Sequence, residues 1–233
     1  MSIKRVVLQP AFVLYTRPYR DTSLLVELLT RQSGRLTVLA RGVRSMRSRA
    51  YGLLRLFSPL LVSFSGKSEL QNLNQVESNG NSYNLSANAL FSGFYVNELL
   101  LRLLQRYDPH PNIYKTYQQT LITLAKFQQS ENALRVFEKK LLVDLGYGLQ
   151  LDRTVNGDPV LPEKNYTFEF GVGLQKTKTA GQHSFSGGSL LALQMDNLAS
   201  EEELRDAKKL LHAALRVLLG GRPLKTQTFF NYF

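Results

Sequence analysis

Residues 31–49 of the chain read RQSGRLTVLARGVRSMRSR, and this stretch combines a turn, a strand and a run of arginines. The triplet Gln32-Ser33-Gly34 is a turn signal, and residues 36–40 are a short run of apolar and branched side chains that is typical of a strand. Small residues separate the arginines in the connector that follows, residues 40–49. The stretch therefore predicts the end of a hairpin, its second strand and a basic loop.

Runs of the same kind lie on both sides of this stretch, so residues 1–80 are predicted to hold five short strands. A second hairpin turn is predicted at residues 65–68, SGKS. The predicted strands are residues 11–15, 24–29, 36–40, 56–64 and 70–76. Five such strands with a basic connector after the third fit a small barrel such as the oligonucleotide-binding (OB) fold. A five-stranded SH3-like barrel fits the same periodicity.

After residue 80 the pattern becomes helical. The polar, Asn-rich segment SNGNSYNLS at residues 78–86 is a connector, and apolar residues recur at helical spacing after it. The fold class is therefore α+β, with a five-stranded barrel, of the OB or the SH3-like kind, at residues 1–80 and a mainly helical domain at residues 81–233. Residues 152–188 are expected to form a loop-rich insertion. The predicted helices are residues 86–104, 112–128, 133–145 and 200–220.

The charge of the chain is concentrated in its first third. The chain has 29 Lys+Arg and 18 Asp+Glu, which gives a formal net charge of +11. Its hydrophobic content of 43% is enough to bury a core. Residues 1–80 hold twelve of the basic residues and four of the acids. Residues 31–55 contain seven arginines, no lysine and no acid. Arginine favours a role in phosphate binding because its planar guanidinium offers a bidentate fork and can stack on bases.

These arginines are the candidate residues for binding nucleic-acid phosphates. Small residues between the arginines are expected to keep the connector flexible and to let the backbone approach an anion. Tyr15, Tyr19 and Tyr51 adjoin arginine-bearing segments and are candidates for stacking on bases, whereas most other aromatics are expected in the core. A solvated basic loop is the alternative interpretation. The residues predicted to bind nucleic acid are Arg17, Arg31, Arg35, Arg41, Arg44, Arg47, Arg49 and Tyr51.

The sequence argues against catalysis, cofactors and metal sites. The chain has no cysteine and three widely separated histidines, and it lacks the usual nucleotide-binding and nucleophile motifs. The acids of residues 1–80 are too scattered for the paired metal ions of phosphodiester cleavage. It has no signal peptide and no long uncharged apolar run, so we expect a soluble, cytoplasmic protein.

Arg135 borders an apolar stripe in the helical part, formed with Leu134, Phe137 and Leu142. An arginine beside a hydrophobic groove could hold an acidic, aromatic-ended peptide of a partner protein. An ion pair between Arg135 and Glu138 or Glu131 on a solvated helix face accounts for the same spacing.

Short blocks along the chain carry a family resemblance: AFVL at 11–14, RP at 17–18, TSL at 22–24, SGR at 33–35, GVRS at 42–45, PLL at 59–61, YVNELL at 95–100, ALR at 133–135, FE at 137–138, LGYG at 145–148 and LGGRPLK at 219–225. The NELL and LGYG blocks, in this order behind an arginine-rich barrel, are specific together and weak singly. In these blocks the whole chain resembles the bacterial RecO family of recombinational repair proteins, in particular its gammaproteobacterial branch.

The resemblance implies an OB-fold domain followed by a helical domain, no catalysis, and a role as a recombination mediator after DNA damage. Family members bind single- and double-stranded DNA, anneal complementary strands, and with RecR, and RecF in some pathways (the RecFOR pathway), help load RecA onto strands coated by single-stranded DNA-binding protein. The acidic C-terminal tail of that coating protein contacts the helical domain in related members, and the matching arginine here is Arg135. We therefore expect a nucleoid-associated mediator. A generic OB-fold module that binds RNA or single strands is the alternative.

Some RecO proteins carry a cysteine zinc site in the C-terminal part. This chain has no cysteine, so residues 152–188 are expected to fold without zinc.

Overall fold

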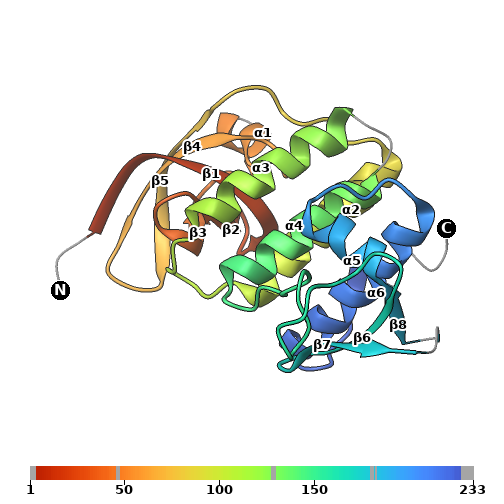
Figure 1. Cartoon of the computed structure of the whole chain (residues 1–233). Helices are drawn as coiled ribbons and strands as arrows, with labels where there is room; N and C mark the ends of the chain where they lie inside the picture. The colour runs from red at the N-terminus through yellow and green to blue at the C-terminus, as the bar shows by residue number, and fades with distance from the viewer. Residues whose placement is uncertain (1–3, 46–47, 127–129, 179–180, 182, 227–233) are drawn as a thin grey trace. The chain divides into compact units, whose positions relative to one another are not determined.

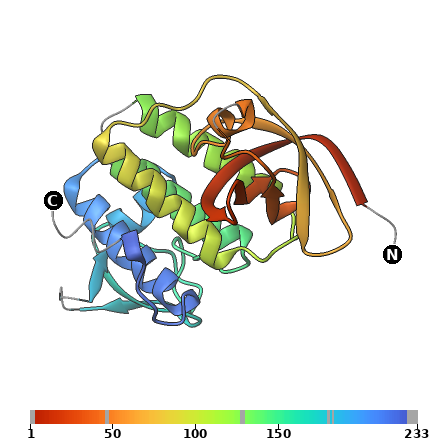
Figure 2. The ribbon, with the colours of Figure 1, turned by 180° about the vertical axis from the view of Figure 1, so that it is seen from behind.

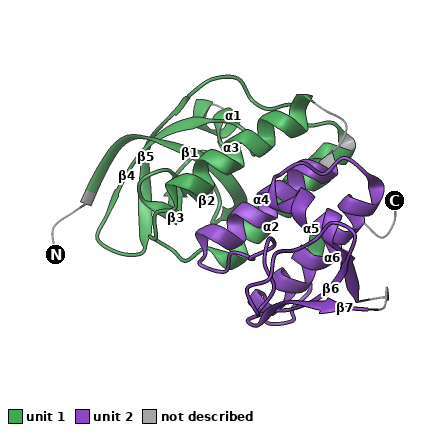
Figure 3. Ribbon diagram, viewed as in Figure 1, with its two compact units in different colours: residues 1–128, 224–233 green, residues 129–223 purple. Residues whose placement is uncertain are grey.

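The structure is a computed structural model that describes residues 4–45, 48–126, 130–178, 181 and 183–226. The chain divides into two compact units (Figure 3): unit 1 comprises residues 1–128 and 224–233, and unit 2 comprises residues 129–223. Among the described helices, none is long and apolar enough to cross a membrane. The elements of unit 1 are β1 (Lys4–Tyr19), β2 (Ser23–Thr30), β3 (Gly34–Ala40), α1 (Arg49–Leu53), β4 (Leu60–Gly66), β5 (Leu70–Ser78), α2 (Ala87–Leu103) and α3 (Pro111–Lys126).

The strands of unit 1 close into a barrel in the order β1-β2-β3-β5-β4 (Figure 1). All neighbours are antiparallel except β3 and β5, which run parallel through three residue pairs from Thr37 with Leu70 to Leu39 with Asn72. Alternate residues of each strand point inward, and Val26, Leu28, Leu36, Val38 and Val62 are completely buried there. The barrel and the helices after it confirm the α+β class and the OB fold.

β1 is much longer than the predicted strand because it has a different partner along each half. Residues 4–11 pair with β4 and residues 11–19 pair with β2, with a bulge between Val13 and Tyr15. Figures 1 and 2 show the start of β1 and the β4–β5 hairpin extending together from the barrel. β4 begins four residues later than predicted, since Phe57 has a left-handed φ of 59° and Pro59 follows it.

Helices α2 and α3 lie against the outer side of β1. The ring of Phe12 packs 5.3 Å from that of Tyr114 and 5.1 Å from that of Tyr117. The Tyr117 hydroxyl donates to Asn97 Oδ1 (2.7 Å), and Asn97 Nδ2 donates to the Leu14 carbonyl (3.0 Å). Burial raises the pKa of Tyr117, so this hydroxyl stays a donor. The two helices therefore form one compact unit with the barrel, while the domain boundary at residue 80 stays a prediction.

The chain returns to unit 1 near its end. The carboxylate of Glu98 on α2 accepts hydrogen bonds from the backbone N–H groups of Lys225 and Thr226, both at 2.9 Å, and from the Thr226 hydroxyl at 2.8 Å. Glu98 thus acts as a cap for the short helical turn at residues 225–226.

Unit 2 packs helices against a small sheet of order β7-β6-β8. The predicted loop-rich insertion contains this sheet, which is built around Tyr166, a buried residue whose hydroxyl accepts from the Leu161 N–H (2.8 Å). A Cβ on Gly187 would lie 1.9 Å from the Leu161 carbonyl oxygen, so only glycine fits there. The elements are α4 (Ser130–Asp144), β6 (Asn165–Glu169), β7 (Gly173–Thr177), β8 (Ser184–Ser186), α5 (Gly187–Gln194) and α6 (Glu201–Leu218).

Candidate nucleic-acid interface

The positive charge of the chain belongs to unit 1. This unit holds 17 of the 29 Lys+Arg and 6 of the 18 Asp+Glu, which leaves 12 of each in unit 2. Unit 2 therefore has a formal charge of zero, and the whole excess of +11 lies with the barrel, α2, α3 and the chain end. A polyanion should be attracted to unit 1.

Within unit 1, the β1–β2 turn and the arginine-rich connector lie side by side. The backbone N–H of Arg44 donates to the Thr22 carbonyl at 2.8 Å. Arg44 Nη1 lies 3.3 Å from the carbonyl oxygens of both Arg20 and Asp21. Two segments that are twenty residues apart in sequence thus share one end of the barrel. The exposed arginines here form what we call the arginine rim: Arg17, Arg20, Arg41 and Arg44.

The described part of the connector is anchored, contrary to the expected flexibility. Val43 is 6% exposed and packs into the barrel core, while Arg41 and Arg44 on either side of it are exposed. Gly42 has a φ of 67°, a left-handed conformation that glycine adopts without steric strain. The chain can therefore turn at Gly42, with Val43 in the core and the two arginines exposed. Because the backbone is already held in place, a phosphate that binds these arginines has less loop entropy to overcome.

The rim arginines are not neutralised by carboxylates. Within the described part of the chain, none of the four forms an ion pair with an Asp or Glu side chain. Asp21 lies in the same turn, but it offers Arg44 its backbone carbonyl. The Arg20 guanidinium lies 5.4 Å from the centre of the Tyr19 ring. Most guanidinium donors of the rim therefore remain open to an anion.

Arg35 lies apart from the rim in an ionic network. Its Nη1 is 3.0 Å from Glu27 Oε2, and its Nε donates to the Leu104 carbonyl at 3.1 Å. Glu27 also binds Arg106 Nη2 at 3.1 Å and the Thr37 hydroxyl at 2.5 Å. Arg35 thus links β3 to the residues after α2, and its donors are directed inward. We leave it out of the proposed interface.

The structure distributes the other predicted DNA-binding residues over the barrel. Arg31 lies in the β2–β3 turn, at the other end of β2, where its N–H donates to the Pro10 carbonyl (3.1 Å). Arg49 and Tyr51 are exposed on α1, and Arg47 lies outside the described residues. The rim therefore unites Arg17, Arg41 and Arg44 and adds Arg20. Arg20 was not predicted, and its position between the predicted strands 11–15 and 24–29 was the available signal.

The stripe around Arg135 is buried in unit 2. Arg135 is 3% exposed, and Leu134, Phe137 and Leu142 are also buried. Arg135 Nη2 lies 2.8 Å from Glu138 Oε1, and Nη1 lies 3.3 Å from His212 Nε2. Arg135 and Glu138 form the predicted ion pair, but the pair lies in the core of unit 2 and not on a solvated helix face. An acidic peptide would have to displace Glu138 to reach the guanidinium, and the peptide-binding role stays a prediction.

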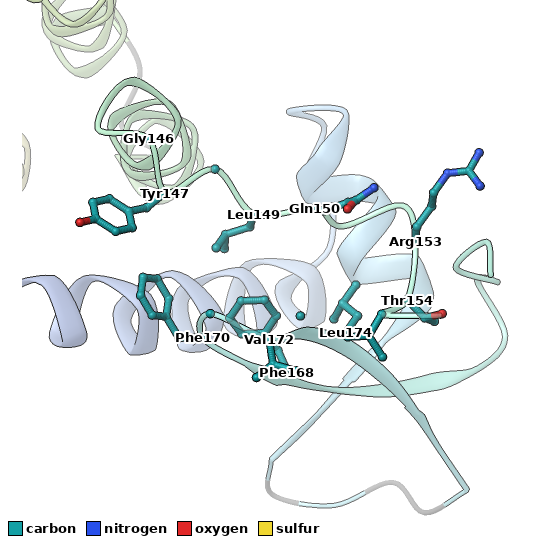
Figure 4. Close-up of a pocket in the computed structure, with 14 residues that line it drawn as sticks. Gly146, Tyr147, Leu149, Gln150, Arg153, Thr154, Phe168, Phe170, Val172 and Leu174 are labelled. Carbon is teal, nitrogen blue, oxygen red and sulfur yellow. The ribbon is translucent and has the colours of Figure 1, made fainter. Parts of the chain in front are cut away.

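Unit 2 also has an open pocket of about 360 Å³ (Figure 4). The rings of Tyr147 and Phe170 stack at its edge with centroids 6.0 Å apart. Most of the other lining residues are apolar or glycine, but Gln150, Arg153 and Thr154 also line the pocket, and Figure 4 shows the Arg153 side chain turned away from the cavity. The pocket lacks the clustered arginines of the rim, so it is a weaker candidate for phosphate binding.

Comparisons with known proteins cover nearly the whole chain. Residues 1–81 match the family described as "Recombination protein O N terminal", and residues 85–228 match "Recombination protein O C terminal". The DNA repair protein RecO of Coxiella burnetii (strain CbuG_Q212) is 47% identical over 226 residues, which cover 96% of this chain and 97% of that protein.

Other RecO proteins are similar over the same span. The DNA repair protein RecO of Alkalilimnicola ehrlichii is 44% identical over 235 residues, covering 99% of this chain and 93% of that protein. The RecO of Methylococcus capsulatus is 42% identical over 230 residues, with coverage of 97% and 94%. The chain therefore has a role in DNA repair and belongs to the RecO family.

Proposed function

We propose that the chain is a DNA-binding recombination mediator that anneals complementary single strands. The observation that carries the proposal is the arginine rim, in which four exposed arginines gather at one end of an OB barrel and form no ion pair with a carboxylate of the described residues. A surface of this charge attracts phosphates of any sequence, because the contacts go to the DNA backbone.

The mechanism follows from the electrostatics of the two strands. Two phosphate backbones repel each other, and salt screens that repulsion only at separations beyond about 8–10 Å, so it persists as the strands approach. Arginines that neutralise phosphates on both strands lower the barrier to their approach, while base pairing supplies the sequence specificity. In this role the protein is a scaffold that requires no catalytic residue, metal or nucleotide.

The partners in the proposal are those of a recombination mediator. With RecR, and with RecF, the protein would help load RecA at the nucleoid onto DNA coated by single-stranded DNA-binding protein. The family membership supports a place in recombination. The zero net charge of unit 2 makes it a better surface for protein partners than for DNA. Contact between Arg135 and the acidic tail of the coating protein is part of this proposal and would require α4 or Glu138 to rearrange.

The first prediction concerns salt dependence. We expect the double variant Arg41→Ala with Arg44→Ala to bind a labelled single strand more weakly, with a flatter slope of log K against log salt. Each lost phosphate contact changes that slope by about 0.7, so the pair should change it by about 1.4. Fluorescence anisotropy over a range of salt concentrations measures both quantities.

A matched control removes the same charge from unit 2. Lys164 and Lys178 are exposed there, and changing both to alanine should leave the slope unchanged. If the rim variant retained the wild-type affinity and slope, or if the control lost as much, the rim would not be the binding surface. Tighter binding of RNA than of DNA at equal salt would favour a generic RNA-binding module instead.

A further inference from the structure

Tyr15 is a large exposed side chain in the middle of a rigid strand. Its residue is 51% exposed although its neighbours Leu14 and Val13 are buried, because the β1 bulge between Val13 and Tyr15 turns this side chain outward. Tyr15 pairs across the sheet with Glu27, and Arg17 pairs with Leu25 on the same outer face. An aromatic ring is thus held over the outside of the barrel, two residues before the first arginine of the rim.

Positively charged side chains lie on both sides of Tyr15. On one side lies Arg17, about 7 Å along the strand, and the rest of the rim continues from there. On the other side Glu27, its cross-strand neighbour, holds the guanidinium of Arg106 at 3.1 Å. Because Glu27 also binds Arg35, two cations balance one carboxylate, and the Arg106 side chain remains 44% exposed. The positive surface therefore continues from the rim past Tyr15 to Arg106.

The other exposed tyrosines of unit 1 are less suited to stacking. The ring of Tyr19 is half-buried and already has the Arg20 guanidinium over it. Tyr51 lies on the five-residue helix α1, which follows the undescribed residues 46–47. Tyr107 has its hydroxyl bound to the Glu69 carbonyl. Tyr15, by contrast, has no aromatic or cationic partner among the described side chains, so its ring face is open.

We infer that Tyr15 is the platform on which an unstacked base of single-stranded DNA stacks, with Arg17 and Arg106 binding the flanking phosphates. The inference rests on the proposed DNA-binding function and adds to it a basis for selecting single strands. Aromatic stacking accepts every base, since each base has a π-face, and so fits a protein that must bind any sequence. In a duplex the base faces are covered by their neighbours, so only the arginine contacts remain.

The test uses the absence of tryptophan from the chain. In the variant Tyr15→Trp the new indole is the sole tryptophan, and a stacked base should quench its emission. We expect an unlabelled thymine oligonucleotide to quench it in step with binding, as measured by anisotropy of a labelled copy. A duplex should bind with little quenching. Tyr147→Trp, an exposed position of unit 2, is the matched control and should show no quenching.

Two further variants measure the contribution to affinity. Tyr15→Ala should weaken single-strand binding by about 5- to 150-fold and leave duplex binding near wild type. Tyr15→Phe, which keeps the ring, should retain wild-type affinity for both. Unchanged duplex binding by Tyr15→Ala also shows that the barrel still folds.

The outcomes separate this inference from the function on which it rests. If Tyr15→Trp binds single strands by anisotropy without any quenching, or if Tyr15→Ala weakens single-strand and duplex binding equally, the stacking role is overturned and the arginine rim stands. If the wild-type protein binds neither single strands nor duplex, both the inference and the proposed function fail.

Discussion

At the scale of single residues, the ion pair of Arg135 and Glu138 shows how far sequence spacing can be interpreted. The spacing of three residues on a helix predicts a contact between the two side chains, and the contact is present at 2.8 Å. The spacing does not predict how deeply the two side chains are buried. Their burial depends on α6 packing against α4 and on His212, whose Nε2 lies 3.6 Å from Glu138 Oε1. The apolar neighbours of Arg135 form a core and not an exposed groove.

Removing one member of this pair should destabilise unit 2 strongly. Arg135→Ala removes the guanidinium group from beside the buried carboxylate of Glu138, and we expect a loss of about 3–5 kcal/mol in the free energy of unfolding. The double variant Arg135→Met with Glu138→Leu removes both charges and should recover most of the lost free energy of unfolding. Urea unfolding compares the three proteins. A wild-type stability for Arg135→Ala, or no recovery in the double variant, would contradict the buried pair.

At the scale of secondary structure, strong periodic patterns with clear end signals were predicted well. β2, β3 and α6 lie close to their predicted bounds, since alternating apolar residues, the Gln32-Ser33-Gly34 turn and the Ser200–Glu203 capping box are local signals. The short α1 and the strands β7 and β8 were missed because three to five residues carry too little periodicity. Arg17, Arg41 and Arg44 could be listed from sequence, whereas Arg20 was missed because the contact that brings it next to Arg44 is tertiary.

The cap of α6 gives a prediction with a pH dependence. Glu203 Oε2 accepts from the backbone N–H groups of Ala199 and Ser200, at 2.6 and 2.8 Å, and these bonds lower the pKa of Glu203 below its ordinary 4.5. A carboxyl group whose pKa is lower in the folded than in the unfolded state stabilises the fold at pH values above its unfolded pKa. This stabilisation is lost as the pH falls through the folded pKa.

We therefore expect Glu203→Gln to be less stable than wild type at pH 7, with a difference that narrows as the pH falls below 4.5. Ser200→Ala, which removes the other half of the box, should cost about 0.5–2 kcal/mol at neutral pH. Urea unfolding at several pH values measures both. A difference between wild type and Glu203→Gln that stays constant with pH would exclude ionised Glu203 as the capping group.

At the scale of the whole molecule, the charge is divided more sharply than the sequence indicated. If the chain is divided at residue 80, the later part has a formal net charge of +3. If it is divided by compact unit, unit 2 has a net charge of zero. The basic residues after residue 80 that belong with the barrel are Arg102, Arg106, Lys115, Lys126 and Lys225. The excess positive charge thus belongs to unit 1, and in our proposal DNA binding by this unit should weaken steeply with salt. The neutral unit 2 is left for contacts that do not depend on phosphate.

Strand annealing tests the central claim most directly. Two complementary labelled oligonucleotides are mixed without nucleotide or metal, and the rate of duplex formation is followed by energy transfer with wild type, the Arg41/Arg44 double variant and the Lys164/Lys178 control. We predict that wild type and the control accelerate annealing equally, and that the rim variant loses most of the acceleration and is the more sensitive to added salt. Equal acceleration by the rim variant, or none by wild type, would contradict the account.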